Sequence, residues 1–176
     1  MVDYQQHISA LLTSVKTKKN PQVRKPYRKP EAVQELERVY HDRKLRTSRL
    51  PANAILRTTF EDRTSNGLTA CIIAHIKLKD GSAYRINSQG QYDTKLKRWR
   101  YSGMRKGVPD IQAVVNGQYL GIEVKVGRDQ QSEYQRKVQA EIEASGGQYY
   151  LARNFTDFRA WFENVKKINE TAKYCS

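Results

Sequence analysis

The sequence predicts an α/β fold in which helices flank a mixed sheet, with the core order α-β-β-β-α-β-α and a basic helical N-terminal extension. Three patterns predict it. Apolar residues recur at helical spacing over residues 64–80, an Asn-Gly pair at 116–117 separates two apolar runs, and a helix, a strand and a helix follow over residues 132–173. We assign residues 1–59 to the extension and residues 60–176 to the core domain, which suits the length of 176 residues.

The composition indicates which kind of partner the protein binds and in which cellular compartment it works. Lys and Arg number 32 against 18 Asp and Glu, so the formal net charge of +14 predicts a polyanionic partner. No segment approaches the roughly 18 consecutive apolar residues that a membrane helix needs, and the first twenty residues lack an apolar signal core. Cys71 and Cys175 are the two cysteines, so no disulfide framework is expected. We therefore expect a cytoplasmic protein that does not bind a membrane.

The extension contains two segments with helical spacing of apolar residues. The first covers residues 4–15, and a basic, proline-punctuated stretch over residues 16–30 reads as a linker. The second segment covers residues 31–46 and places Val33, Leu36, Val39 and Tyr40 on one face. We expect this second helix to be a solvated strut.

Start and stop signals delimit the core elements. Thr64-Ser65-Asn66 begins a helix that ends at Asp80-Gly81. A later helix begins at Ser132 and is ended by Gly146-Gly147. The expected strands cover residues 83–87, 98–101 and 148–152, a polar loop covers residues 89–93, and the last helix covers residues 156–173.

The hairpin with the turn Asn116-Gly117 contains the candidate catalytic residues. If these two residues form the turn, Val115 faces Gln118, and the register places Asp110 opposite Glu123. Strand alternation then puts Lys125 on the same face as Glu123. The opposite, core-facing side receives Ile111, Ala113, Val115, Leu120, Ile122 and Val124.

Two directly opposed carboxylates repel each other, because their Cβ atoms lie about 4.5 to 5.5 Å apart. A divalent cation converts this penalty into a binding site, and Mg²⁺ accepts one or two carboxylates, several waters and phosphate oxygens. The ammonium group of Lys125 would orient or deprotonate an attacking water, or offset charge on a phosphate. Glu-x-Lys on an exposed strand face is also common without any chemical role. The cross-strand register and the positive charge together favour the catalytic interpretation.

Four segments resemble a known family: Gly107-Val108-Pro109-Asp110, Gly121-Ile122-Glu123-Val124-Lys125, Ser132-x-x-Gln135 and Gly146-Gly147. Over about residues 64–163 the chain resembles the PD-(D/E)xK nuclease superfamily, and within it the VRR-NUC (virus-type replication-repair nuclease) domain, with similarity to archaeal Holliday junction resolvases. The resemblance implies a restriction-endonuclease-like core and Mg²⁺- or Mn²⁺-dependent hydrolysis of DNA, often at branched or flapped structures. It also implies a homodimer from a bacterium or a bacterial virus. By position, Asp110 and Glu123 would hold the metal and Lys125 would serve the water.

The same resemblance suggests further site residues. Gln135 is similar to the family glutamine near the metal, although Ser132 and Gln135 also match a capping box that only satisfies a helix start. Asn66 stands where the family commonly has a Glu, and it could equally be an ordinary cap, so a second metal is in question. Glu61, or the neighbouring Asp62, could substitute for it. Ser88 is similar in placement to a functional serine of the resolvases, or is a turn former.

Residues 95–107 interleave cations with aromatic side chains just before Asp110. Such a stretch tracks a nucleic-acid backbone and stacks on exposed bases, or is a basic edge strand protected from aggregation by its charge. Arg85 would contact phosphate or pair with a carboxylate. The candidate nucleic-acid-binding residues are Arg85, Lys97, Arg98, Trp99, Arg100, Arg105 and Lys106.

The leading hypothesis is therefore a metal-dependent DNA endonuclease that uses Mg²⁺ or Mn²⁺ and no small-molecule cofactor. The alternatives are a noncatalytic nucleic-acid-binding protein on a nuclease scaffold, and an assembly factor that binds a partner through the helix over residues 31–46. The sequence leaves open the preferred DNA structure, DNA against RNA, and the dimer interface.

Overall fold

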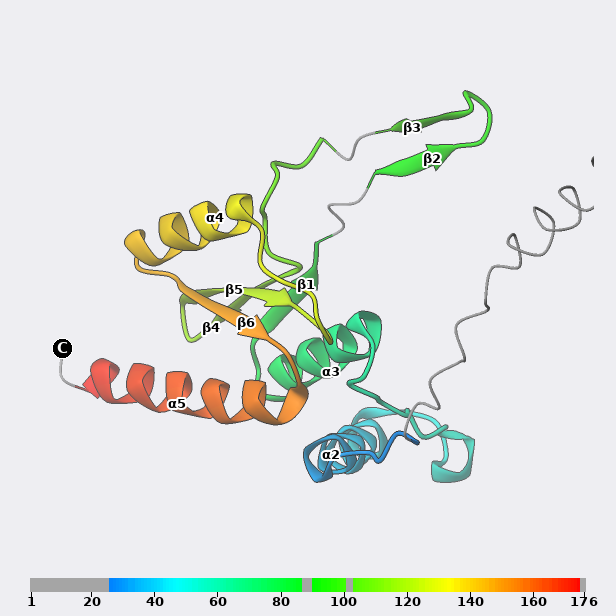
Figure 1. The fold of residues 1–176 in the computed structure, drawn as a ribbon. Coiled ribbons are helices and arrows are strands. Elements are labelled where there is room, and N and C mark those ends of the chain that lie inside the picture. Colours follow the sequence, from blue (N-terminus) through cyan, green and yellow to red (C-terminus); the bar gives the residue numbers. More distant parts are fainter. Residues whose placement is uncertain (1–25, 87–89, 101–102, 175–176) are drawn as a thin grey trace, which may run out of the picture.

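The computed structural model describes residues 26–86, 90–100 and 103–174, with side chains in the last helix as far as Val165 (Figure 1). The predicted helix over residues 4–15, most of the basic stretch and Ser88 lie outside the described residues. The helices are α2 (Glu31–Thr47), the short 3-10 helix η1 (Ala52–Ala54), α3 (Ser65–Leu78), α4 (Glu133–Ala144) and α5 (Phe155–Tyr174). The strands are β1 (Ser82–Arg85), β2 (Gln91–Asp93), β3 (Arg98–Arg100), β4 (Ile111–Val115), β5 (Gln118–Val124) and β6 (Gln148–Ala152).

The main sheet has the strand order β1-β4-β5-β6. Strands β1, β4 and β5 pair antiparallel, whereas β5 and β6 pair parallel through the crossover helix α4. Figure 1 shows α4 on one face of this sheet and α3 and α5 on the other, with α2 beyond them. The prediction of a mixed sheet flanked by helices is confirmed, and α3, α4, α5 and the four sheet strands follow the predicted order along the chain.

The hairpin has the predicted register. Asn116 and Gly117 both have positive φ, at 51° and 82°, as a two-residue turn that matches the twist of its strands requires. Val115 pairs with Gln118, and the ladder runs on to the pair of Ile111 with Ile122. One further step along this register brings Asp110 opposite Glu123. The turn therefore fixes which residues meet at the far end of the hairpin.

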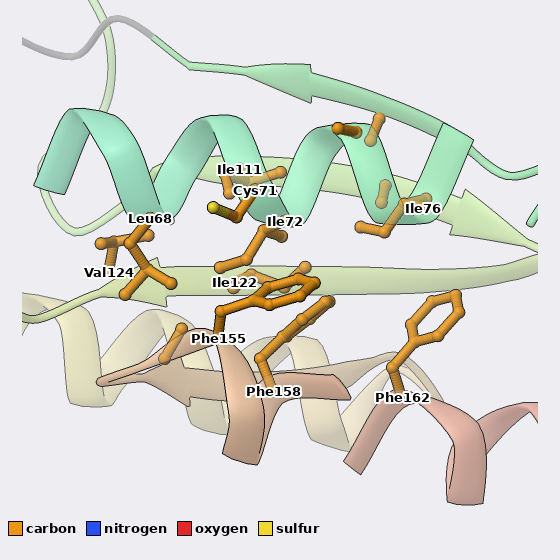
Figure 2. Packing of buried hydrophobic residues seen from close by; sticks show 14 of the residues in the cluster. Leu68, Cys71, Ile72, Ile76, Ile111, Ile122, Val124, Phe155, Phe158 and Phe162 are labelled. Carbon is orange, nitrogen blue, oxygen red and sulfur yellow. The ribbon is translucent and has the colours of Figure 1, made fainter. Parts of the chain in front are cut away.

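The hydrophobic core lies between the sheet and helices α3 and α5 (Figure 2). The predicted core face of the hairpin is buried there, and each fully buried aliphatic side chain contributes about 1.5 to 3 kcal/mol to stability. Side chains from these elements pack together in Figure 2: Leu68, Cys71, Ile72 and Ile76 from α3, Ile111, Ile122 and Val124 from the strands, and Phe155, Phe158 and Phe162 from α5. This core holds the hairpin rigidly from one side.

Helix α2 differs from its expected role. Ala32, Val33 and Leu36 are buried and belong to the same core as α3 and α5. Tyr40 packs edge-on against Phe60, with ring centroids 5.4 Å apart. The expectation of a solvated strut is wrong for this face, because its few apolar residues dock on the helical layer. The core therefore continues across the assigned boundary between residues 59 and 60.

Strands β2 and β3 form a separate two-stranded ribbon, with Tyr92 opposite Trp99 and Asp93 opposite Arg98. The predicted strand over residues 98–101 is observed as β3, but the predicted polar loop over residues 89–93 contains β2. The loop prediction was wrong because residues 91–93 are polar apart from Tyr92, and so show no alternation of apolar side chains. In Figure 1 the ribbon stands away from the main sheet.

Candidate active site

The backbone and side chain of Asp110 are bonded to the two neighbouring strands. Its side-chain Oδ2 accepts a hydrogen bond from the backbone N–H of Val124 at 3.0 Å, and its backbone carbonyl accepts one from Ile86 at 2.7 Å. Because these bonds tie it to β5 and to the end of β1, the carboxylate has little freedom to turn away. Asp110 is thereby held at the end of the hairpin.

The loop before Asp110 lies directly against the first turn of α4. Gly107 has a φ of 88°, and a Cβ atom built on it would lie 2.4 Å from the backbone oxygen of Tyr134. A side chain at this position would both strain the backbone and push the loop off the helix. Gly107 therefore couples the position of Asp110 to the start of α4.

Glu123 is the most buried acid of the site, with 2% of its surface exposed. Its Oε1 accepts a hydrogen bond from Nε2 of Gln135 and lies 3.2 Å from Nζ of Lys125. Its Oε2 is buried and has no hydrogen-bond partner within the described part of the chain. Burial and the negative charge of Asp110 raise the pKa of Glu123 to about 7, against the opposing effect of Lys125.

Lys125 joins two carboxylates, because its Nζ lies 3.2 Å from Glu123 Oε1 and 3.3 Å from Asp129 Oδ2. Burial alone would lower the pKa of the amine, but hydrogen bonding and attraction to the two acids outweigh it and raise the pKa. The side chain is therefore a charged ammonium group in this state of the protein. Sequence reasoning missed Asp129, for which the only signal is its position four residues after Lys125.

Gln135 fulfils both roles that the sequence left as alternatives. Its Oε1 accepts from the backbone N–H of Ser132 at 2.8 Å, and Ser132 Oγ accepts from the backbone N–H of Gln135 at 3.3 Å, which completes a capping box. The Nε2 group of the same amide donates to Glu123. An amide has separate donor and acceptor groups, so one side chain starts α4 and orients the buried acid.

Tyr149 is a second residue that the sequence did not indicate. In the parallel register of β5 and β6 it lies beside Gly121, on the same face as Glu123. Its hydroxyl group is buried, and burial and the charge of Glu123 raise its pKa against the opposing effect of Gln131. Finding it requires the pairing of β5 with β6, which no local pattern reveals.

The donor set fits a hard divalent cation. Asp110 keeps Oδ1 without a hydrogen bond in the described chain, and Glu123 keeps the buried Oε2. No group of three or more His, Cys, Asp or Glu residues that could hold a metal occurs among residues 26–86, 90–100 and 103–174. Two carboxylates suit Mg²⁺, which takes its remaining ligands from water and phosphate oxygens, whereas a structural Zn²⁺ site needs four protein ligands.

The additional candidate ligands have other hydrogen-bond partners. Asn66 Oδ1 accepts a hydrogen bond from the guanidinium of Arg85 at 2.8 Å, so Arg85 has a neutral amide partner rather than a carboxylate. Glu61 accepts hydrogen bonds from the hydroxyl of Thr64 and from the backbone N–H of Arg63. Asp62 is buried and accepts from the first backbone N–H of α5. None of these hydrogen bonds involves Asp110 or Glu123.

The candidate nucleic-acid-binding residues fall into two groups. Lys97, Arg98, Trp99 and Arg100 lie on the β2–β3 ribbon and are exposed. The residues that follow contact α4: Arg105 forms two 2.6 Å hydrogen bonds with Glu141, and the Lys106 ammonium lies 5.6 Å from the ring centre of Tyr134. The loop leading to Asp110 is therefore fixed to α4 by two further contacts.

Comparisons of the chain with protein-family models, with curated proteins and with solved structures found no significant match. In the part of the chain that the structure describes, no helix has both the length and the apolar character required to cross a membrane.

Proposed function

We propose that the protein is a metal-dependent endonuclease that hydrolyses phosphodiester bonds in DNA at Asp110, Glu123 and Lys125. The observation that carries the proposal is the cross-strand acid pair beside a buried ammonium, with one carboxylate oxygen, Glu123 Oε2, buried and unpartnered. Leaving a buried carboxylate oxygen without a partner costs free energy, so such an atom calls for a ligand. A cation shared by Asp110 and Glu123 would satisfy it.

Each residue has a distinct task in the proposed reaction. Asp110 and Glu123 would hold Mg²⁺ or Mn²⁺, which when bound supplies positive charge at the scissile phosphate and lowers the pKa of a bound water. Lys125 lies beside the pair and is aimed at it, so it would orient the attacking water or offset the charge that grows on the phosphate. Gln135 is a positioning residue, because its amide holds Glu123 from the start of α4.

The surroundings support DNA as the substrate. The net charge of +14 favours a polyanion, and a basic ribbon precedes the site in the chain. The motif resemblance and the element order of the main sheet support a restriction-endonuclease-like core of the VRR-NUC type that acts on branched DNA in replication, recombination or repair. A homodimer in the bacterial or phage-infected cytoplasm completes the proposal, since cutting two strands symmetrically takes two active sites.

A second candidate is a noncatalytic nucleic-acid-binding protein with the same scaffold. It is favoured by the contact of Asn66 with Arg85, because an amide replaces the acid that the resembled family commonly has in the first core helix. Under this hypothesis the protein binds DNA equally well in Mg²⁺ and in EDTA, and no product forms in either.

The deciding experiment incubates the full chain with linear duplex, flap, fork and four-way-junction DNA in Mg²⁺, in Mn²⁺ and in EDTA. We expect cleavage in either metal, none in EDTA, and a loss of about a hundredfold or more in Asp110→Ala and Lys125→Ala. Lys79→Ala is the matched control, because Lys79 pairs with Glu163 on the α3–α5 side. This variant should cleave DNA at the same rate as the unmodified protein. Cleavage that persists in both site variants rules out the proposed site.

A further inference from the structure

The β2–β3 ribbon exposes two large aromatic side chains. Tyr92 and Trp99 are 49% and 67% exposed, and their rings lie edge to face with centroids 5.8 Å apart. All three residues of β3 are exposed, so this strand buries no side chain in the core. An isolated two-stranded ribbon is only marginally stable, and apolar area left in water adds little to stability. The stability of the core therefore does not explain these two aromatic side chains.

The two faces of the ribbon differ in chemistry. Directly paired residues of an antiparallel ribbon share a face, so Tyr92 and Trp99 occupy one face. The residues on either side of them in each strand occupy the other, where Asp93 lies opposite Arg98 and Arg100 follows. The ribbon therefore presents an aromatic face and a basic face, back to back.

Local turn chemistry shapes the ribbon without a core. Asp93 Oδ1 accepts hydrogen bonds from the backbone N–H groups of Lys95 at 2.9 Å and Leu96 at 3.0 Å, and Lys97 adopts a positive φ of 48°. These contacts hold the tip through the backbone. The aromatic pair can therefore be altered while the turn stays intact.

The net positive charge of the ribbon favours a polyanion as its partner. Asp93 is the one acid between residues 91 and 100, and it pairs with Arg100 at 3.6 Å. Lys95, Lys97 and Arg98 have no carboxylate partner in the described parts of the chain. Exposed aromatics beside surplus cations match the two components of a nucleic acid, since bases stack on rings and phosphates attract cations.

The arrangement of the two faces points to a particular DNA feature. An uninterrupted duplex hides the flat surfaces of its bases, so an aromatic face has nothing to stack on there. At a fork or branch the last base pair and the unpaired bases expose these surfaces, and a second strand diverges nearby. A ribbon with rings on one side and cations on the other fits between the exposed base and the diverging backbone.

We propose that the β2–β3 ribbon is a wedge that recognises the discontinuity in base stacking at a DNA branch. Tyr92 and Trp99 stack on the exposed base, and Arg98, Arg100 and the lysines of the tip contact the phosphates of the diverging strand. This inference rests on the proposed function, because the wedge would choose where the acid pair cuts. The chain connects the two, since residues 101–109 lead from β3 to Asp110.

The test measures binding in EDTA, where metal-dependent cleavage is absent. Fluorescence anisotropy compares a forked DNA with a fully paired duplex that has the same number of nucleotides. We expect the unmodified protein to bind the fork about tenfold more tightly, since stacking one base on an aromatic ring changes affinity by about five- to 150-fold. Replacing the pair by Tyr92→Leu and Trp99→Leu keeps apolar side chains in the strands but removes the rings. This variant should lose the preference and keep duplex binding.

The basic face has a separate signature. The Arg98→Ala and Arg100→Ala double variant should bind the fork more weakly and reduce the slope of log affinity against log salt by about two. Tyr84→Ala is the matched control, because Tyr84 is 65% exposed but lies on β1. Circular dichroism and thermal unfolding check that all variants keep the fold.

Failure of the wedge and failure of the nuclease are distinguishable. An unchanged preference for the fork in the leucine variant overturns the wedge, as does a variant that weakens fork and duplex equally. If the unmodified protein cleaves DNA with metal but shows no preference in EDTA, the wedge alone is wrong. If it prefers the fork through Tyr92 and Trp99 but cleaves nothing in Mg²⁺ or Mn²⁺, the nuclease proposal is wrong and the wedge stands.

Discussion

Replacing Glu123 by Gln should stabilise the metal-free protein at alkaline pH. In the folded protein the pKa of Glu123 is about 7, compared with an ordinary value of 4.5. At 1.36 kcal/mol per pKa unit, ionising this carboxyl in the folded protein costs about 3 kcal/mol more than in the unfolded chain. Gln has nearly the same shape and no charge, and its carbonyl oxygen still accepts the hydrogen bond from Gln135. We therefore expect Glu123→Gln to be more stable by about 3 kcal/mol at pH 8.

The sign of the pH dependence follows from the protons bound. Between about pH 4.5 and pH 7 the folded protein holds a proton on Glu123 that the unfolded chain has released. The contribution of this group to the free energy of unfolding therefore falls as the pH rises through that interval, and it is constant above and below it. At pH 4 the unmodified protein and Glu123→Gln should consequently be nearly equal in stability.

The assay is urea unfolding at pH 4, 6 and 8 in EDTA, with Glu133→Gln as the control. Glu133 lies exposed on the first turn of α4, where it pairs with Lys137, so its removal should change stability little at any of these pH values. Measuring the pH dependence separates the titration of Glu123 from any uniform packing effect. If Glu123→Gln is more stable by the same amount at all three pH values, or less stable at pH 8, then burial does not raise the pKa of Glu123 as argued.

Three further predictions concern the parts that position the site. Gly107→Ala should destabilise the protein by about 1 to 3 kcal/mol and reduce cleavage, whereas Gly103→Ala, also at positive φ but in open space, should cost less; thermal unfolding compares them. Gln135→Glu keeps an acceptor for the helix cap, but its ionised carboxylate cannot donate to Glu123, so the cleavage rate should fall while the melting temperature changes little. A cleavage rate equal to that of the unmodified protein would contradict the positioning role of Gln135. Leu36→Ala should cost about 2 to 5 kcal/mol in urea unfolding, and a neutral result would contradict the docking of α2.

The hairpin could be predicted from sequence because its determinants are local. An Asn-Gly turn admits few registers, and one register decides every pair along the two strands, from Val115 opposite Gln118 to Asp110 opposite Glu123. The limits of α3 were equally accessible, since Thr64 caps the helix and apolar residues follow at a fixed period. Features of this kind are determined by residues close together in the sequence and depend little on the segments that pack against them.

The missed features depend on contacts between distant segments. Tyr149 reaches the site only because β6 pairs with β5 in parallel, and Asp129 becomes a partner of Lys125 only through the course of the loop after β5. The docking of α2 rests on a few apolar residues, Ala32, Val33, Leu36 and Tyr40, in a highly charged helix whose composition suggests that it is solvated. The strand β2 has almost no apolar side chain to reveal it. Each of these is decided by tertiary structure rather than by local propensity.

Neighbouring residues of strand β5 have opposite effects on the stability of the fold. Ile122 and Val124 face the core and stabilise the fold, while Glu123 between them is buried on the other face, beside a like charge and with one oxygen unpartnered. Gln at this position would keep the shape and the bond to Gln135 without the charge. The ion pair with Lys125 favours the acid, but burial and the charge of Asp110 outweigh it, because the pKa of Glu123 is still raised. A divalent cation would reverse the balance, because it would turn the repulsion between Asp110 and Glu123 into shared coordination. The unfavourable burial of this carboxylate therefore supports the metal-dependent function that we propose.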